Sequence, residues 1–596
     1  MKIKSSILIS TAILTFILMS CNQQISKPIP PQLFNNDWQF ILSADSAEVF
    51  DAQNTLAWEK VSLPHTARLE PLIVNDQWQG ICWYRKDFVL PENVKGKNLF
   101  LRFEGAMNVA EVWVNGVKKI IHLGGYLPFV IDFTKEARHD EMNRVLVKLD
   151  NRDNPITGPK PLKQLDFNMY GGLYRDVFLV IENDVFITNP IIENKKDAGI
   201  FVTYPVVTPE KAVVHVETHV KNTGDGNGEI VVKNEILGVC NETEADIEIA
   251  NPKLWSPKSP NLYHLVTNVY VDGELADTDT TRIGIRRFEI TKDRFAINGE
   301  EMFLRGVNRH QEYPYIGYAL SNNAQYRDAR IIKEAGFDYV RLSHYPHSTA
   351  FMDACDELGL VVLDAIPGWQ YFSDDPAFQD QAIQTCRDMV RRDRNHACVL
   401  AWEVSLNESW MPEAFIDRAV AAAREEFPGD QRFTAGWQKY GYDIYLQARQ
   451  HRLEHYEDPG KPYIVSEYGD WEYYAMNAGL NQHEWSGLKQ EERSSRQFLG
   501  SGEKRLLQQA ANIQEAHNDN FSTPAFADGY WVMFDYNRGY TDDLEASGIM
   551  SIFRQPKFSY DFFRSQRDAG ETSSKYSSGP MVAPASYWDQ NSDPLI

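Results

Sequence analysis

The chain has 596 residues, of which 43% are hydrophobic, and this length suits about three to five domains with separate cores. Its 83 acidic and 60 basic residues give a formal net charge of −23. This charge argues against nucleic acid as a partner, because phosphate binding needs a concentrated basic face.

The N-terminus has the pattern of a secretion signal over residues 1–20, because Lys2 and Lys4 precede an apolar stretch, 7–19, that is too short to span a membrane comfortably. Residues 18–21, "LMSC", resemble a bacterial lipobox, which implies lipidation of Cys21 and a membrane contact through that anchor only. The expected location is the bacterial periplasm or outer membrane. Two alternatives are an ordinary signal peptide with an incidental cysteine and a transmembrane anchor.

The other cysteines are odd in number and widely spaced, so we expect no disulfide framework and no structural metal; they are Cys82, Cys240, Cys355, Cys386 and Cys398.

Three regions with different patterns follow the signal. Short alternating strands broken by Gly, Pro, Asn and Asp over residues 33–183 predict a β-sandwich. The same rhythm over 184–287 has the length of an immunoglobulin-like β-sandwich. Helix and strand patterns alternate over 288–569, which predicts a (β/α)8 TIM barrel, and residues 570–596 form a Ser-, Gly- and Pro-rich tail.

Several phrases from residue 33 to about 563 together resemble glycoside hydrolase family 2. The first sandwich contains "LFNNDWQF" and "WYRKDF", and the barrel region contains "LRGVNRHQE", "VRLSHYPHS", "RDRNHACVLAWEVSLNES" and "VSEYGDW". The resemblance implies a jelly-roll-like sugar-binding domain, an immunoglobulin-like domain and a C-terminal catalytic barrel. It also implies that an oligosaccharide is the substrate.

Two glutamates are candidates for the chemistry, because hydrolysis of a glycosidic bond needs two carboxyls that flank the anomeric carbon. Glu408 and Glu467 each follow an apolar strand, at the end of the barrel where active sites of this fold lie. A lone glutamate there would more often be a solvated strand end. The resemblance implies that Glu408 is the acid/base and Glu467 the nucleophile of a retaining enzyme, with the carboxyls roughly 5–5.5 Å apart.

The resemblance implies substrate contacts from further side chains, which are Asp166, His310, His344, Asn407 and Trp531. The histidines and the tryptophan could instead serve barrel packing. We expect Arg341 to hold Glu467 or the local network rather than the sugar, since strand-end arginines commonly pair with buried carboxylates. No cofactor is expected, and "AIPGW" after Asp364 lacks the Glu-x-His pair of metal-dependent relatives, which predicts catalysis without a metal.

The terminal sugar is the open question, because the family includes β-galactosidases, β-glucuronidases and β-mannosidases. Residues 545–547, "EAS", stand where glucuronidases carry Asn-x-Lys, and a glutamate there would repel a uronate. We therefore expect an exo-acting β-galactosidase that releases terminal galactose from polysaccharide-derived oligosaccharides. Arg538 keeps a β-glucuronidase as the alternative, and a non-catalytic glycan-binding surface lipoprotein is the alternative of another class. The sequence carries no signal for the oligomeric state.

Overall fold

The computed structural model describes residues 27–42, 46–50, 56–240, 243, 246–292, 294–449, 458–470, 489, 491–571, 581–588, 590 and 592. The proposed lipidation site Cys21 and the signal sequence lie outside the described residues. Within these ranges, none of the helices combines the length and apolarity needed to cross a bilayer.

The first domain is a sandwich of two antiparallel sheets, with strand orders β1-β10-β5-β8 and β3-β2-β4-β9-β6-β7. Burial alternates along the strands, as in β6 and β10, because successive side chains of a strand point to opposite faces. The buried faces of both sheets form one hydrophobic core. The strands are β1 (Ile29–Leu33), β2 (Trp38–Leu42), β3 (Glu59–Val61), β4 (Ile81–Val89), β5 (Asn98–Phe103), β6 (Val109–Val114), β7 (Val117–Leu123), β8 (Phe129–Asp132), β9 (Met142–Asp150) and β10 (Val177–Glu182), with the short helix α1 (Ser46–Phe50) after β2.

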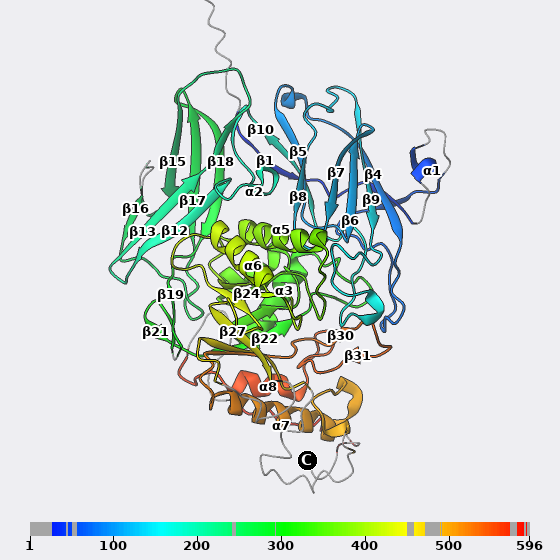
Figure 1. Ribbon diagram of the computed structural model, residues 1–596, viewed down its shortest axis with the longest axis vertical. Helices are drawn as coiled ribbons and strands as arrows, with labels where there is room; N and C mark the ends of the chain where they lie inside the picture. The colour runs from blue at the N-terminus through cyan, green and yellow to red at the C-terminus, as the bar shows by residue number, and fades with distance from the viewer. Residues whose placement is uncertain are drawn as a thin grey trace, which may run out of the picture.

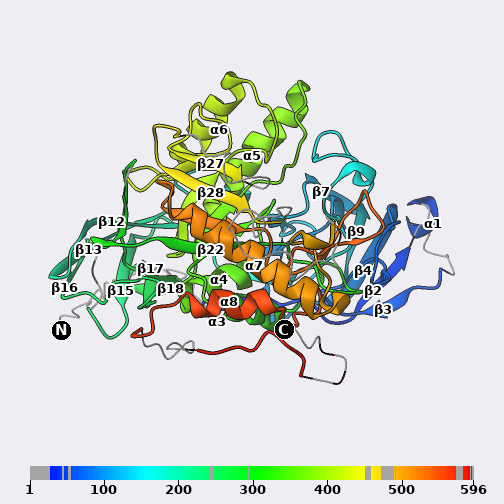
Figure 2. The same ribbon diagram turned by 90° about the horizontal axis from the view of Figure 1, so that it is seen from below.

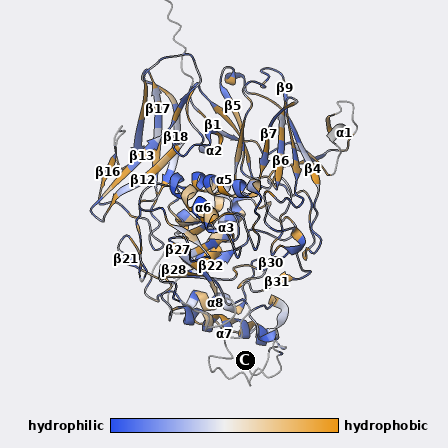
Figure 3. Ribbon diagram, viewed as in Figure 1, coloured by the Kyte–Doolittle hydropathy of each residue, from blue (hydrophilic) through white to orange (hydrophobic). Residues whose placement is uncertain are grey.

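The second domain is a smaller sandwich with sheets β12-β13-β16 and β15-β17-β18 and the pair β11-β14. Its core is built from alternate residues of both sheets, and Figure 3 shows orange and blue segments along the strands of both sandwiches. The elements are β11 (Val185–Ile187), α2 (Pro190–Glu193), β12 (Ile200–Val207), β13 (Lys211–Thr218), β14 (Val220–Asn222), β15 (Ile230–Ile236), β16 (Ile247–Ala250), β17 (Tyr263–Val271) and β18 (Glu274–Ile283). A three-stranded sheet leads into the barrel, formed by β19 (Phe288–Ile290), β20 (Phe295–Ile297) and β21 (Glu300–Glu301).

The third domain is a closed barrel of parallel strands in the order β22 to β29, as the alternating helix and strand patterns predicted. Its strands are β22 (Leu304–Arg309), β23 (Tyr339–Leu342), β24 (Val361–Ala365), β25 (Val399–Glu403), β26 (Thr434–Gly436), β27 (Ile444–Arg449), β28 (Tyr463–Tyr468) and β29 (Ala527–Tyr530). The helices are α3 (Asn322–Glu334), α4 (Thr349–Leu358), α5 (Pro376–Asp393), α6 (Glu413–Glu426), α7 (Glu503–Asn520) and α8 (Phe558–Ser565). The short strands β30 (Tyr536–Asn537) and β31 (Leu544–Glu545) pair after the barrel closes.

Serine caps and one glycine fix where two of these helices begin and end. The hydroxyl oxygens of Ser321 and Ser348 accept hydrogen bonds from backbone N–H groups in the first turns of α3 and α4. Helix α4 ends at Leu358 and is capped by Gly359, whose φ of 72° lies in the left-handed region. A Cβ atom there would lie 2.7 Å from the carbonyl oxygen of Pro257, so only glycine fits.

The two sandwiches lie side by side over the barrel in Figure 1, and Figure 2, turned by 90° and seen from below, shows α3, α4, α7 and α8. The first sandwich meets the loops that follow barrel strands: Arg175 donates to the carbonyl of Pro346 at 3.1 Å, and the Tyr170 hydroxyl donates to Glu312 at 2.8 Å. The second sandwich meets the opposite end, where Arg394, just before β25, donates to the carbonyl of Ala198 at 2.5 Å. The first sandwich therefore borders the end of the barrel where the candidate carboxyls lie.

The described residues 581–588 of the tail run along α7. The Tyr587 hydroxyl donates to the carbonyl of Leu499 at 3.1 Å, and the Ser586 hydroxyl donates to Glu503 at 2.9 Å. Part of the tail is thus held against the barrel, although its Ser, Gly and Pro content predicted little structure.

Candidate active site

The two candidate carboxyls stand at the C-terminal end of the barrel. Glu467 is the penultimate residue of β28 and is 3% exposed. Glu408 lies in the loop after β25 and is half-buried, with a φ of 49° that turns the backbone sharply at this point. The side-chain amide of Gln370 donates to Glu408 Oε2 at 2.7 Å and fixes that carboxyl. Both glutamates therefore lie at the C-terminal face of the barrel, where the active sites of this fold are found.

Arg341, at the end of β23, joins the buried acids of the site. Its Nε and Nη2 donate to the two oxygens of Glu403 at 2.7 and 2.5 Å, and its Nη1 donates to Glu467 Oε1 at 2.7 Å. Further bonds reach the side-chain oxygens of Asn308 at 3.2 Å and Asn407 at 3.0 Å. The guanidinium, which is fully buried, thus orients Glu467 and supplies its counter-charge.

The charge state of Glu467 depends on opposing effects. Burial raises its pKa to about 8, Arg341 acts in the lowering direction through its charge and its hydrogen bond, and the charge of Glu408 raises the pKa. The charge of Glu408 therefore acts on Glu467, whose carboxylate form becomes populated as the pH rises through about 8.

A wall of rings borders the carboxyls. His344 stacks on Trp531 with centroids 5.3 Å apart and an interplanar angle of 12°, and His310 lies 4.2 Å from the ring of Tyr536. Burial lowers the pKa of His310 to about 3 and that of His344 well below its usual value, so both rings are neutral. His310 Nε2 and His344 Nδ1 are buried and have no hydrogen-bond partner among the described residues. Buried polar atoms without a protein partner suit contacts with sugar hydroxyls.

Asp166 reaches the same region from the first sandwich. The Tyr536 hydroxyl donates to Asp166 Oδ2 at 2.6 Å, and burial together with the charge of Glu545 raises the Asp166 pKa to about 7. Glu545 is 1% exposed and pairs with Arg538 at 3.0 Å and Arg496 at 3.1 Å. The sequence led us to expect that Glu545 would repel a uronate; in the structure Arg496 and Arg538 pair with this glutamate.

Sequence reasoning missed Glu403, Gln370 and Tyr536. Glu403 ends β25 within an apolar run, so its position predicted a strand end and nothing more. Gln370 belongs to the loop after β24, and its contact with Glu408 spans residues that are far apart in the chain. The signal that could have found Glu403 is Arg341 itself. A buried guanidinium has five N–H donors and needs more acceptors than the single carboxylate of Glu467 provides.

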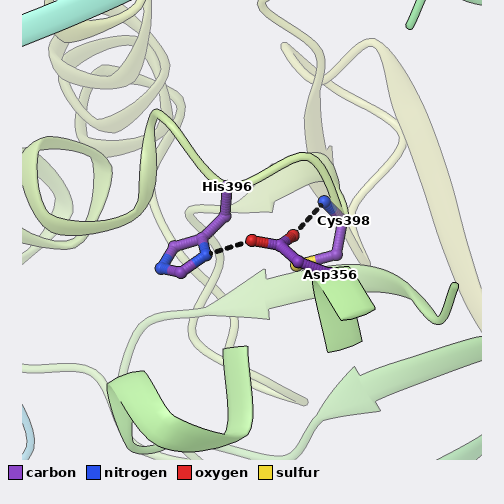
Figure 4. Close-up of side chains that lie close together, drawn as sticks. All are labelled: Asp356, His396 and Cys398. Carbon is purple, nitrogen blue, oxygen red and sulfur yellow. Dashed lines mark hydrogen bonds and ion pairs between the residues drawn. The ribbon is translucent and has the colours of Figure 1, made fainter. Parts of the chain in front are cut away.

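Among the described residues, one group of three side chains could offer metal ligands: Asp356, His396 and Cys398 (Figure 4). The Asp356 carboxylate is bound to His396 Nδ1 at 2.7 Å and accepts from the backbone N–H of Cys398 at 2.8 Å. Cys398 directly precedes β25, at the opposite end of that strand from Glu408. These contacts tie α4 to the start of β25, and the group lies away from the candidate carboxyls.

Three family descriptions match successive parts of the chain. Residues 34–182 match "Glycosyl hydrolases family 2, sugar binding domain", residues 179–286 match "Glycosyl hydrolases family 2", and residues 288–428 match "Glycosyl hydrolases family 2, TIM barrel domain". Together the matches follow the three domains seen in the structure.

Known proteins with similar sequences carry two different names. A β-galactosidase of Thermoanaerobacter pseudethanolicus is 32% identical over 591 residues, covering 94% of this chain and 75% of that protein. A β-glucuronidase of Bacteroides fragilis is 30% identical, covering 66% of this chain and 59% of that protein. The crystal structure of a Bacteroides uniformis β-glucuronidase superposes with a TM-score of 0.75 at 22% identity, covering 91% of this chain and 69% of the other, which is a likeness of fold.

Proposed function

The chain belongs to glycoside hydrolase family 2 and is a glycoside hydrolase that acts on oligosaccharides, and we propose that it is a retaining, exo-acting β-galactosidase. The observation that carries the proposed mechanism is the placement of Glu408 and Glu467 at the same end of the barrel, close enough for the charge of Glu408 to act on Glu467, with Glu467 held by the buried Arg341. A double displacement needs one carboxylate as the nucleophile and one carboxyl as the acid/base, and different surroundings let the two groups take these roles.

In the first step, the Glu467 carboxylate attacks the anomeric carbon while the Glu408 carboxyl gives its proton to the departing glycosidic oxygen. A covalent galactosyl ester on Glu467 results. In the second step, Glu408 takes a proton from a water molecule, whose oxygen attacks the anomeric carbon and releases Glu467. Two inversions return the β configuration. Asn407 accepts a hydrogen bond from Arg341 through its Oδ1, and its Nδ2 lies 3.5 Å from His344 Nε2; in the proposed mechanism an N–H of this amide donates to the sugar.

The ion pairs of three cations, Arg341, Arg538 and Lys557, support a neutral sugar. Arg341 pairs with Glu467 at 2.7 Å, Arg538 pairs with Glu545 at 3.0 Å, and Lys557 pairs with Asp535 at 2.7 Å. A uronate carboxylate would have to compete with these carboxylates for a counter-charge, whereas galactose hydroxyls can donate to acceptors such as Asp166. The β-galactosidase of T. pseudethanolicus also matches over 94% of this chain.

A β-glucuronidase is the second candidate. Arg538 Nε is buried without a hydrogen-bond partner among the described residues, and it lies 4.0 Å from Asp166 Oδ1. An N–H group in that position could donate to a sugar carboxylate. The matching β-glucuronidases of B. fragilis and B. uniformis are consistent with this candidate.

We also propose that the mature protein is a bacterial lipoprotein anchored through Cys21 in the periplasm or outer membrane, on the sequence pattern alone. Metabolic labelling of the full-length protein with an alkyne fatty acid tests this proposal. Label in the wild type that disappears in Cys21→Ser is the expected result, and an unlabelled wild-type protein in the soluble fraction would contradict it.

The test of the proposed activity is the initial rate on p-nitrophenyl β-galactoside, β-glucuronide, β-mannoside and β-glucoside. We expect turnover of the galactoside, abolished in Glu467→Gln and retained in Glu413→Gln, which changes an exposed glutamate at the start of α6. Turnover confined to the glucuronide would make the second candidate correct. Binding of glycans without turnover of any glycoside would instead indicate the non-catalytic glycan-binding protein.

A further inference from the structure

One tryptophan at the barrel mouth is exposed in a way that packing does not explain. Trp410 follows Glu408 by two positions and is 78% exposed, although tryptophan is on average a highly buried residue. One side of its ring meets Trp437, with centroids 5.1 Å apart and an interplanar angle of 52°. Trp437 is itself fixed, because its Nε1 donates to the carbonyl of Ser409 at 2.9 Å. Trp410 therefore has a firm support and a free surface.

Loops after consecutive barrel strands are tied together at this point. The backbone N–H of Tyr371, in the loop after β24, donates to the hydroxyl of Ser409 at 2.9 Å, next to the bond from Gln370 to Glu408. Trp437, in the loop after β26, adds a third loop through its bond to the carbonyl of Ser409. Glu408 and the tryptophan pair thus belong to one rim, so the ring of Trp410 keeps a defined place relative to Glu408.

Burial along the loop indicates which part of a substrate would meet this rim. Asn407, which is hydrogen-bonded to Arg341, is 5% exposed, Glu408 is half-buried, Ser409 is 3% exposed, and Trp410 is 78% exposed. Trp410 is therefore the side chain of this stretch that faces solvent beyond Glu408. Because the acid/base protonates the glycosidic oxygen, groups that lie outward from it face the leaving group.

We propose that Trp410, supported by Trp437, is a stacking platform for the saccharide on the leaving-group side, and that the preferred substrates are β-linked oligosaccharides. The apolar face of a pyranose ring packs on an aromatic face, and a rigid tryptophan provides that face with little loss of side-chain freedom. This inference rests on the proposed role of Glu408 as the acid/base. It is independent of which terminal sugar occupies the pocket.

The test compares two galactosides in wild type and Trp410→Ala. Lactose has a sugar as its leaving group, whereas β-galactosyl fluoride has a leaving group without a ring. We expect kcat/KM for lactose to fall about tenfold in Trp410→Ala, the loss of one aromatic contact, with kcat/KM for the fluoride changed less than about twofold. Trp410→Phe should retain most of the lactose activity.

Trp588→Ala is the matched control, because Trp588 is equally exposed, at 78%, and lies in the segment after the barrel. It should change neither substrate's kcat/KM. An unchanged lactose value in Trp410→Ala, or an equal fall for both substrates, would overturn the platform. If wild type hydrolyses another glycoside instead of galactosides, the fluoride and disaccharide of that sugar give the same comparison. No turnover of any glycoside would overturn the proposed function and the platform with it.

Discussion

Replacing Arg341 by glutamine removes the positive charge that holds the proposed nucleophile. The guanidinium makes five hydrogen bonds, of which three go to the carboxylates of Glu403 and Glu467. Glutamine keeps a polar side chain but removes the positive charge that Arg341 supplies to two buried carboxylates. Breaking a buried ion pair in this way costs about 3–5 kcal/mol of folding stability.

The catalytic effect follows from the pKa of Glu467. Burial raises that pKa to about 8 and Arg341 acts to lower it, so Arg341→Gln raises it further. Glu467 attacks as an anion, so kcat/KM falls as the pH drops through this pKa, and the acid limb of the profile moves to higher pH. Loss of one charge-assisted hydrogen bond, about 1.5–3 kcal/mol, predicts a fall in kcat/KM of about 10- to 100-fold at pH 7.

The assay is kcat/KM against pH with β-galactosyl fluoride, combined with the thermal midpoint of each variant. Arg309→Gln is the matched control, because Arg309 is equally buried on the neighbouring strand β22 and pairs with Asp328 at 2.7 Å. It should lose stability without shifting the profile. The double variant Arg341→Gln/Glu403→Gln should regain stability and keep the shifted profile. A profile of Arg341→Gln that superimposes on the wild type would refute this reasoning.

Three further predictions concern other parts of the structure. Glu408→Gln should move the acid limb for β-galactosyl fluoride to lower pH, because the charge of Glu408 raises the Glu467 pKa, and azide should then yield a β-galactosyl azide detectable by NMR. Gln370→Ala should lower kcat/KM for lactose about fivefold, because the variant loses one hydrogen bond to Glu408, worth about 1 kcal/mol. A larger effect on the fluoride than on lactose would contradict this role of Gln370. Although burial opposes it, Asp356 raises the pKa of His396 to about 9. The stability lost in His396→Gln, measured by calorimetry, should therefore be greatest below about pH 6.5 and vanish as the pH rises through 9, with activity unchanged; a pH-independent loss would argue against the ion pair.

The arrangement of β-sandwiches and barrel was predictable because it depends on periodicity. Alternating burial in strands such as β6 and continuous burial in β25 come directly from the residue pattern. The hydrogen bonds that hold residues 581–588 against α7 were not predictable, since they come from single polar contacts such as that of Ser586 with Glu503. Such contacts leave no periodic signal in the sequence.

In the candidate site, too, some features could be predicted from the sequence and others could not. Glu408 and Glu467 could be found because each ends an apolar strand pattern and stands in a family phrase. The balance of charges could not be found, because Glu545 meets Arg496 and Arg538 only after the chain has folded. Of these two partners, the sequence pointed only to Arg538 as a possible cation. The exposure of Trp410 is likewise a property of the folded rim.

The central claim is that Glu467 forms a covalent bond with the sugar. Incubation with 2-deoxy-2-fluoro-β-galactosyl fluoride should inactivate the enzyme with time, because the fluorine at C2 slows both steps while the fluoride leaving group at C1 keeps the first step fast. A peptic digest should then carry the fluorosugar mass on Glu467. The same mass on another residue, or a wild-type enzyme that turns over galactosides but never accumulates the adduct, would contradict the account.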